Sequence, residues 1–288
     1  MMDGFILVDK PKGITSLSVC NKIKRMFNFD KCGHNGTLDP NTTGVMVIAC
    51  NRATKLLKFI NEHDKEYIAK IVFGYDSDTL DVDGNITNNI NMEFTYDELV
   101  DKVKYLCSLK SQIPPLTSAI KINGMKLYEY QRKGIEVEVK ARETEIYNYE
   151  ILSDLVNVDS HYEIDIKLSV RKGFYVRSFA RDLGQLLGGC AILKELRRIS
   201  AGEFIIDKCK TLEELSISDV KSIKEVFNFK NIEVNTYISK LVMNGVMLDE
   251  RQAKVEEPFN VVYNNKIIAI YEPVELYKYK PVIIFKEG

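Results

Sequence analysis

The most telling part of the chain reads Gly33-His34-Asn35-Gly36-Thr37-Leu38-Asp39-Pro40-Asn41-Thr42-Thr43-Gly44-Val45-Met46-Val47-Ile48-Ala49. Its glycines let the backbone approach a ligand closely or adopt a positive φ. Pro40 fixes its own φ and keeps Asp39 out of the helical region. The apolar run 45–49 predicts a buried strand. The segment therefore predicts a carboxylate held stiffly on a loop at the edge of a sheet, although an Asp-Pro pair among glycines also suits an ordinary turn.

The sequence of this segment resembles the signature GHxGTLDPxATG of the TruB family of tRNA pseudouridine synthases, with Thr42 where alanine is usual. Five further blocks resemble the family in the expected order, covering about residues 3–210 strongly and about the last sixty weakly. In the family the aspartate of this motif is the catalytic nucleophile, and the resemblance gives that role to Asp39. A carboxylate nucleophile forms a covalent intermediate, which splits one difficult step into two.

Two blocks supply candidate partners for Asp39. Residues 173–184 read GFYVRSFARDLG and resemble the GxYxRxxxxDLG motif, whose arginine, here Arg177, pairs with the nucleophile. A buried carboxylate needs such a cation to stay ionised, and the guanidinium fork fits it. Residues 65–74 read KEYIAKIVFG and resemble KxYxAxxxxG, whose tyrosine, here Tyr67, stacks on the flipped base and assists proton transfer. From residue type alone, Arg177 suits a surface position and Tyr67 a core position.

Residues 10–13 read KPKG and resemble the KPxG block of the family. The resemblance makes Lys10 a support of the active-site loop. We also place Lys10 and Lys12 in the substrate-binding set, with Lys12 as a contact for phosphate. His34, with a glycine on one side and another two residues on, is a candidate for base stacking or phosphate contact.

A later segment resembles the insertion that grips the RNA stem-loop in the family. It covers residues 112–134, and its mixture of basic and aromatic side chains suits backbone contacts together with stacking. Within it we assign Lys121 and Arg132 to substrate binding. Residues 193–204 resemble the last catalytic block, whose pair Arg197 and Arg198 serves either phosphate or acidic neighbours in the sheet.

Composition limits the class of protein and of site. The 288 residues, 45% of them hydrophobic and 28% charged, fit one large domain and one small one. No apolar run of about 18 residues is present, so we expect a cytoplasmic protein with no membrane contact. Six cysteines and three histidines lack the spacing of metal ligands. We expect reduced thiols, no metal and no cofactor, and uridine isomerisation needs neither.

Charge is distributed in blocks, although the net charge is −1. Residues 1–60 carry a net +5, residues 62–107 a net −7, residues 110–142 a net +4 and residues 167–198 a net +6. A polyanion responds to the local field within about 8 Å rather than to the total charge. Together with the motifs, the basic blocks therefore favour an RNA partner. Without the motifs, the same charges would indicate only ordinary solvent-exposed surfaces.

The pattern of elements predicts an α+β fold with a mixed, largely antiparallel sheet. Strands are predicted over residues 4–9, 45–50, 65–74, 137–150, 161–170 and 203–207, and helices over residues 16–27, 53–60, 96–107 and 179–188. Residues 76–84 predict an acidic loop and residues 212–227 a polar, helix-like connector.

We expect two domains. Residues 1–228 form a pseudouridine synthase catalytic domain with an RNA-gripping insertion at about 110–142, and residues 229–288 form a small β-rich module that weakly resembles a PUA-like RNA-binding domain. In the module we predict a helix over residues 237–244, strands over 260–263, 267–271 and 282–285, and a hairpin turn at Asn264-Asn265.

The expected function is isomerisation of the uridine at position 55, in the T-loop of tRNA, by base flipping and attack of Asp39 at C1′ or at C6. We expect a monomer that binds the T-arm without a guide RNA or an obligate protein partner. A guide-RNA-dependent synthase is the first alternative, which the long basic insertion disfavours. A non-catalytic tRNA-binding or folding protein is the second, which the set Asp39, Tyr67 and Arg177 disfavours because binding alone does not require it.

Overall fold

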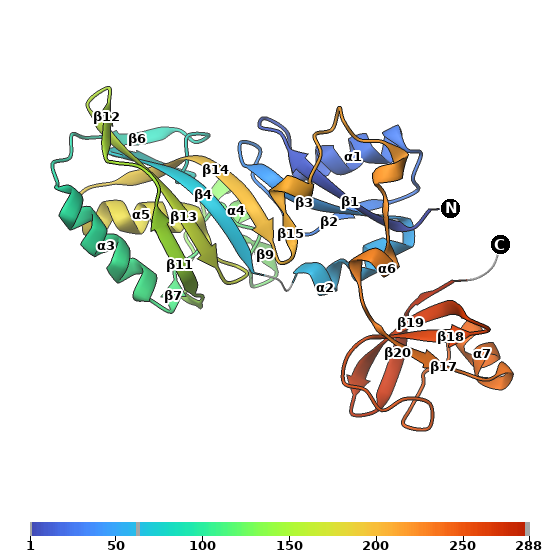
Figure 1. Ribbon diagram of the computed structural model, residues 1–288. Coiled ribbons are helices and arrows are strands. Elements are labelled where there is room, and N and C mark those ends of the chain that lie inside the picture. Colours follow the sequence, from blue (N-terminus) through green and yellow to red (C-terminus); the bar gives the residue numbers. More distant parts are fainter. Residues whose placement is uncertain (1, 62–63, 286–288) are drawn as a thin grey trace.

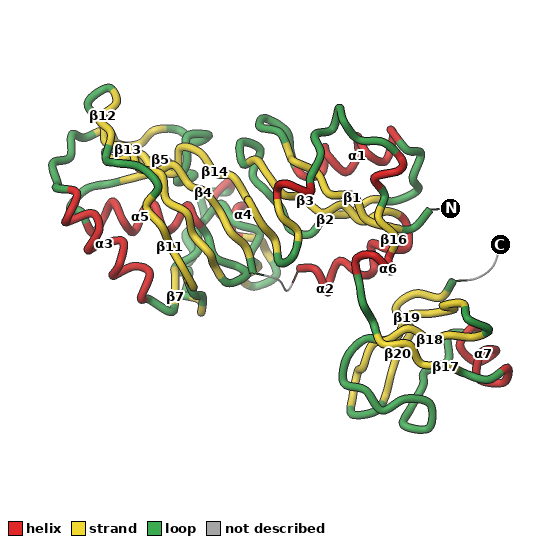
Figure 2. Tube along the Cα trace, viewed as in Figure 1, coloured by secondary structure: helices red, strands yellow, loops and turns green. Residues whose placement is uncertain are grey.

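The computed structural model describes residues 2–61 and 64–285. Its main element is a 10-stranded mixed sheet with the central order β11-β13-β4-β14-β3-β1-β16 (Figures 1 and 2). These strands are β1 (Gly4–Lys10), β3 (Thr43–Cys50), β4 (Lys65–Phe73), β11 (Ile146–Ile151), β13 (His161–Val170), β14 (Ala191–Ala201) and β16 (Lys221–Ser222). β2 (Cys32–His34), β12 (Val156–Val158) and β15 (Phe204–Ile205) pair at its margins with β3, β13 and β14. The predicted α+β class with a largely antiparallel mixed sheet is confirmed.

One half of the sheet, from β11 to β14, packs against two helices (Figure 1). These are α3 (Tyr96–Ser108), which starts at a Thr95–Glu98 capping box, and α5 (Val176–Leu186). Alternate residues of β4, beginning with Tyr67 and Ala69, face the helices and are buried with them in one core. Tyr67 therefore lies on the side of the sheet that packs against α5.

The other half of the sheet, β1 with β2 and β3, is covered on both faces. Helix α1 (Ser16–Met26) buries Val19, Cys20 and Ile23 against one face. The other face packs on the 3-10 helix Asn51–Leu56, on α2 (Leu57–Asn61) and α6 (Ile223–Val226), and on residues from the C-terminal sheet. Because both faces are buried, β3 is a continuous apolar run rather than an alternating one.

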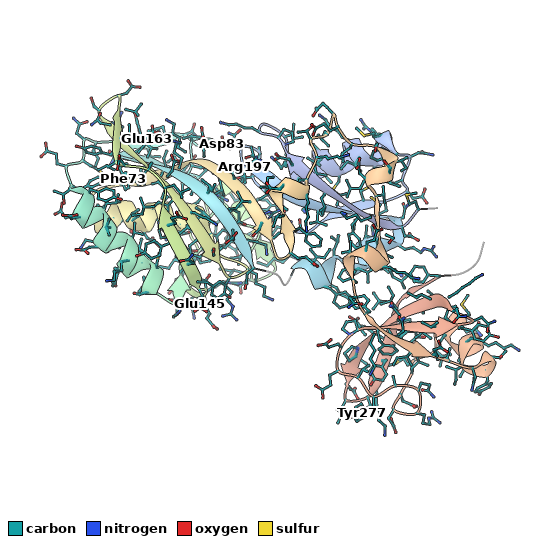
Figure 3. All side chains as sticks on the ribbon, viewed as in Figure 1. Phe73, Asp83, Glu145, Glu163, Arg197 and Tyr277 are labelled. Atoms are coloured by element: carbon teal, nitrogen blue, oxygen red, sulfur yellow. The ribbon has the colours of Figure 1, made fainter. Side chains whose placement is uncertain are left out.

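The two halves of the sheet meet where β14 pairs with β3, and this pairing is parallel, whereas the others in the main sheet's described strands are antiparallel. Figure 3 labels Arg197, a residue of this pairing, and Asp83, which lines a small cavity beside it. Gly44 sits at the pairing with a φ of 104°, and a Cβ there would lie 2.1 Å from the carbonyl oxygen of Arg198. Only glycine allows the strands to approach so closely.

The C-terminal part forms a separate four-stranded sheet in the order β17-β18-β19-β20. Its elements are β17 (Lys230–Glu233), α7 (Thr236–Met243), β18 (Phe259–Tyr263), β19 (Lys266–Glu275) and β20 (Lys278–Ile284). It has a core of its own, which includes Phe259, Tyr271 and Tyr279. Asn264 and Asn265 both have positive φ between β18 and β19, which confirms the predicted hairpin turn.

Three of the predicted elements are wrong in part. Residues 137–141 are not a strand, and only β10 (Arg142–Glu143) and β11 follow them. The segment 212–227 is mostly irregular, with a short 3-10 helix at Ile217–Asp219, β16 and α6. The predicted strand 203–207 shrinks to β15, because a 3-10 helix follows at Ile206–Lys208. β15 pairs with the end of β14, and the side chains of Phe204 and Ile206 pack on the N-terminal half of the sheet.

The remaining elements are short. They are β5 (Tyr75–Ser77), β6 (Ile86–Asn89), β7 (Ser111–Gln112), β8 (Lys121–Ile122), β9 (Met125–Lys126) and α4 (Leu127–Arg132). No helix within the described residues combines the length and the apolar composition needed to cross a bilayer.

Candidate active site

Asp39 lies on the loop of the β2–β3 hairpin, residues 35–42. The Thr42 N–H donates to the carbonyl oxygen of Asp39 at 3.0 Å, which closes a tight turn over Pro40. Asn35 Oδ1 accepts from the Val47 N–H at 3.0 Å and holds the start of the loop against β3. The loop therefore projects Asp39 from the point where the two halves of the sheet join.

Lys10 supports this loop from below. It is 0% exposed, and its Nζ donates to the carbonyl oxygens of Pro11 at 3.0 Å and of Pro40 and Thr42 at 2.8 Å each. Burial lowers the pKa of Lys10 to about 8, against the opposing attraction of the Asp39 carboxylate. Because three carbonyl groups already engage its ammonium, these contacts favour the loop-supporting role over direct contact with substrate.

Arg177, at the start of α5, connects several elements around Asp39. Its Nη2 lies 3.1 Å from Asp39 Oδ2, and its Nη1 lies 3.6 Å from Asp81 Oδ2. Nη1 also donates to the Thr79 carbonyl at 3.0 Å and to Thr117 Oγ1 at 2.6 Å. The side chain of Arg177 is 9% exposed and that of Asp39 is 42% exposed. The guanidinium is thus fixed by four contacts, while the carboxylate is covered only in part.

The electrostatic setting of Asp39 is mixed. Burial raises the pKa of Asp39 above its ordinary value; the Arg177 guanidinium opposes that rise, the Asp81 carboxylate adds to it and Lys10 opposes it. Proximity to Arg177 therefore offsets only part of the cost of burying the charge.

A cavity of about 430 Å³ opens beside this ion pair. Tyr67, buried on β4, lines it together with Asp39 and Arg177, and further lining comes from Thr37, Leu38, Thr42, Thr117, Ser118, Ala119, Tyr128, Phe174, Tyr175, Val176 and Leu196. Ser118 Oγ is buried there without a hydrogen-bond partner among the described residues. A planar, polar ring fits such a mixture of aromatic walls and hydroxyl groups.

Asp81 was missed by sequence reasoning, which counted it within the acidic loop 76–84. The structure buries it, and its Oδ1 accepts from Thr79 Oγ1 at 2.5 Å and from the Asp83 N–H at 3.1 Å. The one available signal was that this loop comes soon after β4, the strand that carries Tyr67, with only the short β5 between β4 and Asp81.

Among the described residues that line this cavity, none of the predicted substrate-binding residues is present. His34 is half-buried on β2, and burial together with the charge of Arg198 lowers the pKa of the imidazole. Lys12 is exposed and lines a cavity of about 240 Å³ with Asn41. Lys121 is exposed on β8.

Arg132 and the Arg197–Arg198 pair have defined neighbours. The guanidinium of Arg132 lies 5.5 Å from the ring centre of Tyr128, a residue of the cavity wall. Arg197 Nη2 lies 2.7 Å from Asp9 Oδ2, which agrees with an acidic neighbour in the sheet. Arg198 is buried and its Nε donates to the Val45 carbonyl at 2.7 Å.

A larger cavity of about 1080 Å³ lies elsewhere, between α6 and the C-terminal sheet, and Asp39 and Arg177 do not line it. No group of three or more His, Cys, Asp or Glu side chains is arranged to hold a metal ion within residues 2–61 and 64–285.

The model of the TruB family pseudouridylate synthase N-terminal domain matches residues 24–176, more than half of the chain. The chain belongs to the TruB family. This TruB chain is a pseudouridine synthase and therefore an isomerase.

Curated TruB relatives match almost the whole chain. The tRNA pseudouridine synthase B of Acholeplasma laidlawii (strain PG-8A) is 39% identical over 276 residues, which cover 94% of this chain and 96% of the relative. The protein of the same name from Aster yellows witches'-broom phytoplasma (strain AYWB) is 35% identical over 288 residues, covering 99% and 100% of the two chains.

Solved structures share the fold. A chain of a Cbf5-Nop10-Gar1 complex has a TM-score of 0.68 at 20% identity and covers 98% of this chain and 84% of its own length. A chain of the archaeal box H/ACA sRNP Nop10-Cbf5 complex has a TM-score of 0.60 at 22% identity, covering 98% and 85%. At this identity the likeness concerns the fold of the TruB chain alone.

Proposed function

We propose that the chain converts uridine 55 in the T-loop of tRNA to pseudouridine, without a guide RNA. The observation that carries the proposal is the 3.1 Å ion pair between Arg177 and Asp39 at the wall of a cavity that Tyr67 also lines. Family membership supplies the reaction class, the names of the relatives point to tRNA, and the uridine position follows from the resemblance of the motifs.

The three side chains have distinct roles in this mechanism. The Asp39 carboxylate attacks the flipped uridine, at C1′ or at C6, and the N1–C1′ bond breaks. The detached uracil stays stacked on Tyr67 and turns, and C5 bonds to C1′. The bond between the base or sugar and Asp39 then breaks, which regenerates the carboxylate. The C5 proton leaves with the help of Tyr67, and N1 takes up a proton from solvent. Arg177 orients the carboxylate and stabilises its charged form through the guanidinium fork.

The insertion contributes directly to the cavity, which supports its role in gripping RNA. Thr117, Ser118 and Tyr128 belong to residues 110–142 and line the wall beside Asp39. Flipping a base costs a few kcal/mol, and phosphate contacts by basic side chains such as Lys12, Lys121 and Arg132 offset it. Binding should therefore weaken steeply with salt. His34 remains a candidate contact at the base of the same hairpin.

We also propose the division into a catalytic domain, residues 1–228, and a PUA-like RNA-binding module, residues 229–288, of which 286–288 lie outside the described residues. The separate sheet that starts at Lys230 and the core around Phe259 support it. Basic and acidic residues balance in this module, so we assign it to shape recognition. We propose a monomer that needs no protein partner.

The decisive experiment measures tritium release from RNA labelled at uridine C5. The purified chain alone is given a T-arm stem-loop, the same stem-loop with cytidine at position 55, and an anticodon stem-loop. We expect one tritium released per T-arm, and none from the other two RNAs, because C5 loses its hydrogen only where the new C–C bond forms.

Two results would contradict the proposal. If release from the T-arm requires added cellular RNA, the chain is a guide-dependent synthase. If the T-arm binds tightly and with salt sensitivity but releases no tritium under any condition, the chain is a tRNA-binding protein.

Asp81→Asn is expected to move the acidic limb of the pH profile of kcat/KM to lower pH. The nucleophile must be ionised, and Asp81 adds to the rise in the pKa of Asp39, so removing its charge lowers that pKa. At neutral pH we expect turnover to fall about tenfold, since Arg177 loses one charged partner. Tritium release across pH checks this, with Asp78→Asn, an exposed residue of the same loop, as the control. An unmoved limb would show that Asp81 does not act on the nucleophile.

A further inference from the structure

The connection between β1 and α1 holds the backbone just after Asp39. The Gly13 N–H donates to the Pro40 carbonyl at 2.9 Å, and Lys10 Nζ donates to the Pro40 and Thr42 carbonyls. These contacts fix the backbone that follows Asp39. The backbone that precedes Asp39 needs a separate constraint, because a loop residue has no strand partner for its backbone groups.

Ser16, the first residue of α1, supplies that constraint. The Leu38 N–H donates to Ser16 Oγ at 2.9 Å, and the same hydroxyl donates back to the Leu38 carbonyl at 3.0 Å. A hydroxyl carries one donor and two acceptor sites, so it can bond both backbone groups at once. Ser16 is 2% exposed and Leu38 4%, so water does not replace either bond. No other hydrogen bond to these two backbone groups is present in the described residues.

The helix does not need this hydroxyl for its own start. Thr15 is the N-cap of α1, and its Oγ1 accepts from the Ser18 N–H at 3.0 Å. The cap of α1 and the contact to the loop are thus divided between two neighbouring hydroxyl residues. This division separates the stability of the helix from the geometry of Asp39.

We propose that Ser16 is a positioning residue for the isomerisation: its hydroxyl fixes the peptide unit that leads into Asp39 and so directs the carboxylate toward Arg177 and the cavity. The inference rests on the proposed role of Asp39 as nucleophile. A displacement of a reacting group by about 1 Å costs about 100-fold in rate. Loss of the Ser16 hydroxyl frees Leu38 from α1 and permits such a displacement.

The test compares Ser16→Ala with Thr15→Ala, its matched control on the same helix turn. Single-turnover tritium release on T-arm RNA measures the rate constant, and filter binding measures the Kd. For Ser16→Ala we expect a rate about 100-fold lower with a Kd within about threefold of wild type. For Thr15→Ala we expect a lowered melting temperature from the lost cap and a rate within about threefold of wild type. Ser16→Thr, which keeps the hydroxyl, should recover most of the rate.

The outcomes separate this inference from the proposed function. Equal rate losses in Ser16→Ala and Thr15→Ala, or a change in Kd alone, would overturn the positioning role. Should Ser16→Ala fail to fold, Ser16→Cys decides, since its thiol fills the site but bonds weakly, and a wild-type rate for it would overturn the role. If Asp39→Asn turns over as fast as wild type, the proposed function itself fails. If Asp39→Asn is inactive and Ser16→Ala is fully active, only the inference about Ser16 fails.

Discussion

Asp39→Asn is expected to lower single-turnover isomerisation by about 10⁴-fold or more, because the amide cannot form the covalent intermediate. RNA affinity should stay within about threefold, since the cavity keeps its shape and the basic residues around it are untouched. Tritium release and filter binding on the same T-arm RNA measure the two quantities.

The same change should leave the protein at least as stable as the wild type. Burial raises the pKa of Asp39, so the folded state binds more protons than the unfolded chain between the ordinary and the raised pKa. Stability therefore falls as pH rises through that window, and at neutral pH the ionised carboxylate disfavours the folded state. Removing the charge relieves this cost, which is the usual trade between activity and stability.

The matched control is Asp30→Asn, an exposed aspartate that precedes β2 on the same hairpin. It should keep full activity and an unchanged melting temperature. Retained turnover in Asp39→Asn would refute the nucleophile. A large loss of melting temperature in that variant would show instead that the Asp39–Arg177 pair mainly holds the fold together.

Arg177→Lys is expected to lower kcat/KM by about 10³-fold and to destabilise the fold by about 3 kcal/mol. A lysine carries one point charge and cannot serve Asp39, Asp81 and Thr117 at the same time, as the guanidinium does. The pKa of Asp39 should rise further, so the acidic limb of the pH profile should move to higher pH, opposite to Asp81→Asn. Tritium release across pH and chemical denaturation measure the two effects.

Arg181→Lys on the same helix is the control, because Arg181 pairs with its neighbour Asp182 and lies outside the cavity wall. It should change neither quantity by more than about twofold in rate or about 1 kcal/mol in stability. Equal losses in Arg177→Lys and Arg181→Lys would remove the special role of Arg177.

Local sequence predicted the strands and helices whose pattern is regular. The apolar runs of β1 and β3 and the helical spacing in α1 and α3 gave those elements nearly to the residue. The central strand β14 was not predicted, because Lys194, Glu195 and Arg197 give it the composition of a solvated segment. Its charges are accommodated by ion pairs with strands far away in the sequence, such as the Lys194–Glu163 pair.

Some residues of the candidate site could likewise be predicted from the sequence, and others could not. Its motif residues were found through resemblance, since neither the spacing of Asp39 nor the residue type of Arg177 or Tyr67 distinguishes them from turn, surface and core residues. Asp81 carries no such mark, because its contact with Arg177 joins an acidic loop to a helix start almost a hundred residues later. Contacts of that range depend on the assembled sheet, and a single sequence does not display them.

The parallel pairing of β14 with β3 sets the order in which the molecule can mature. It joins residue 43 to residue 197, so the chain must close a very long loop before the two halves of the sheet meet. Contacts of such high order form late and slow folding, and synthesis proceeds from the N-terminus. The hairpin that carries Asp39 therefore leaves the ribosome long before the strand and helix that complete its surroundings. We expect a nascent chain to remain inactive until about residue 201 has emerged, which shields unfinished copies from engaging RNA productively.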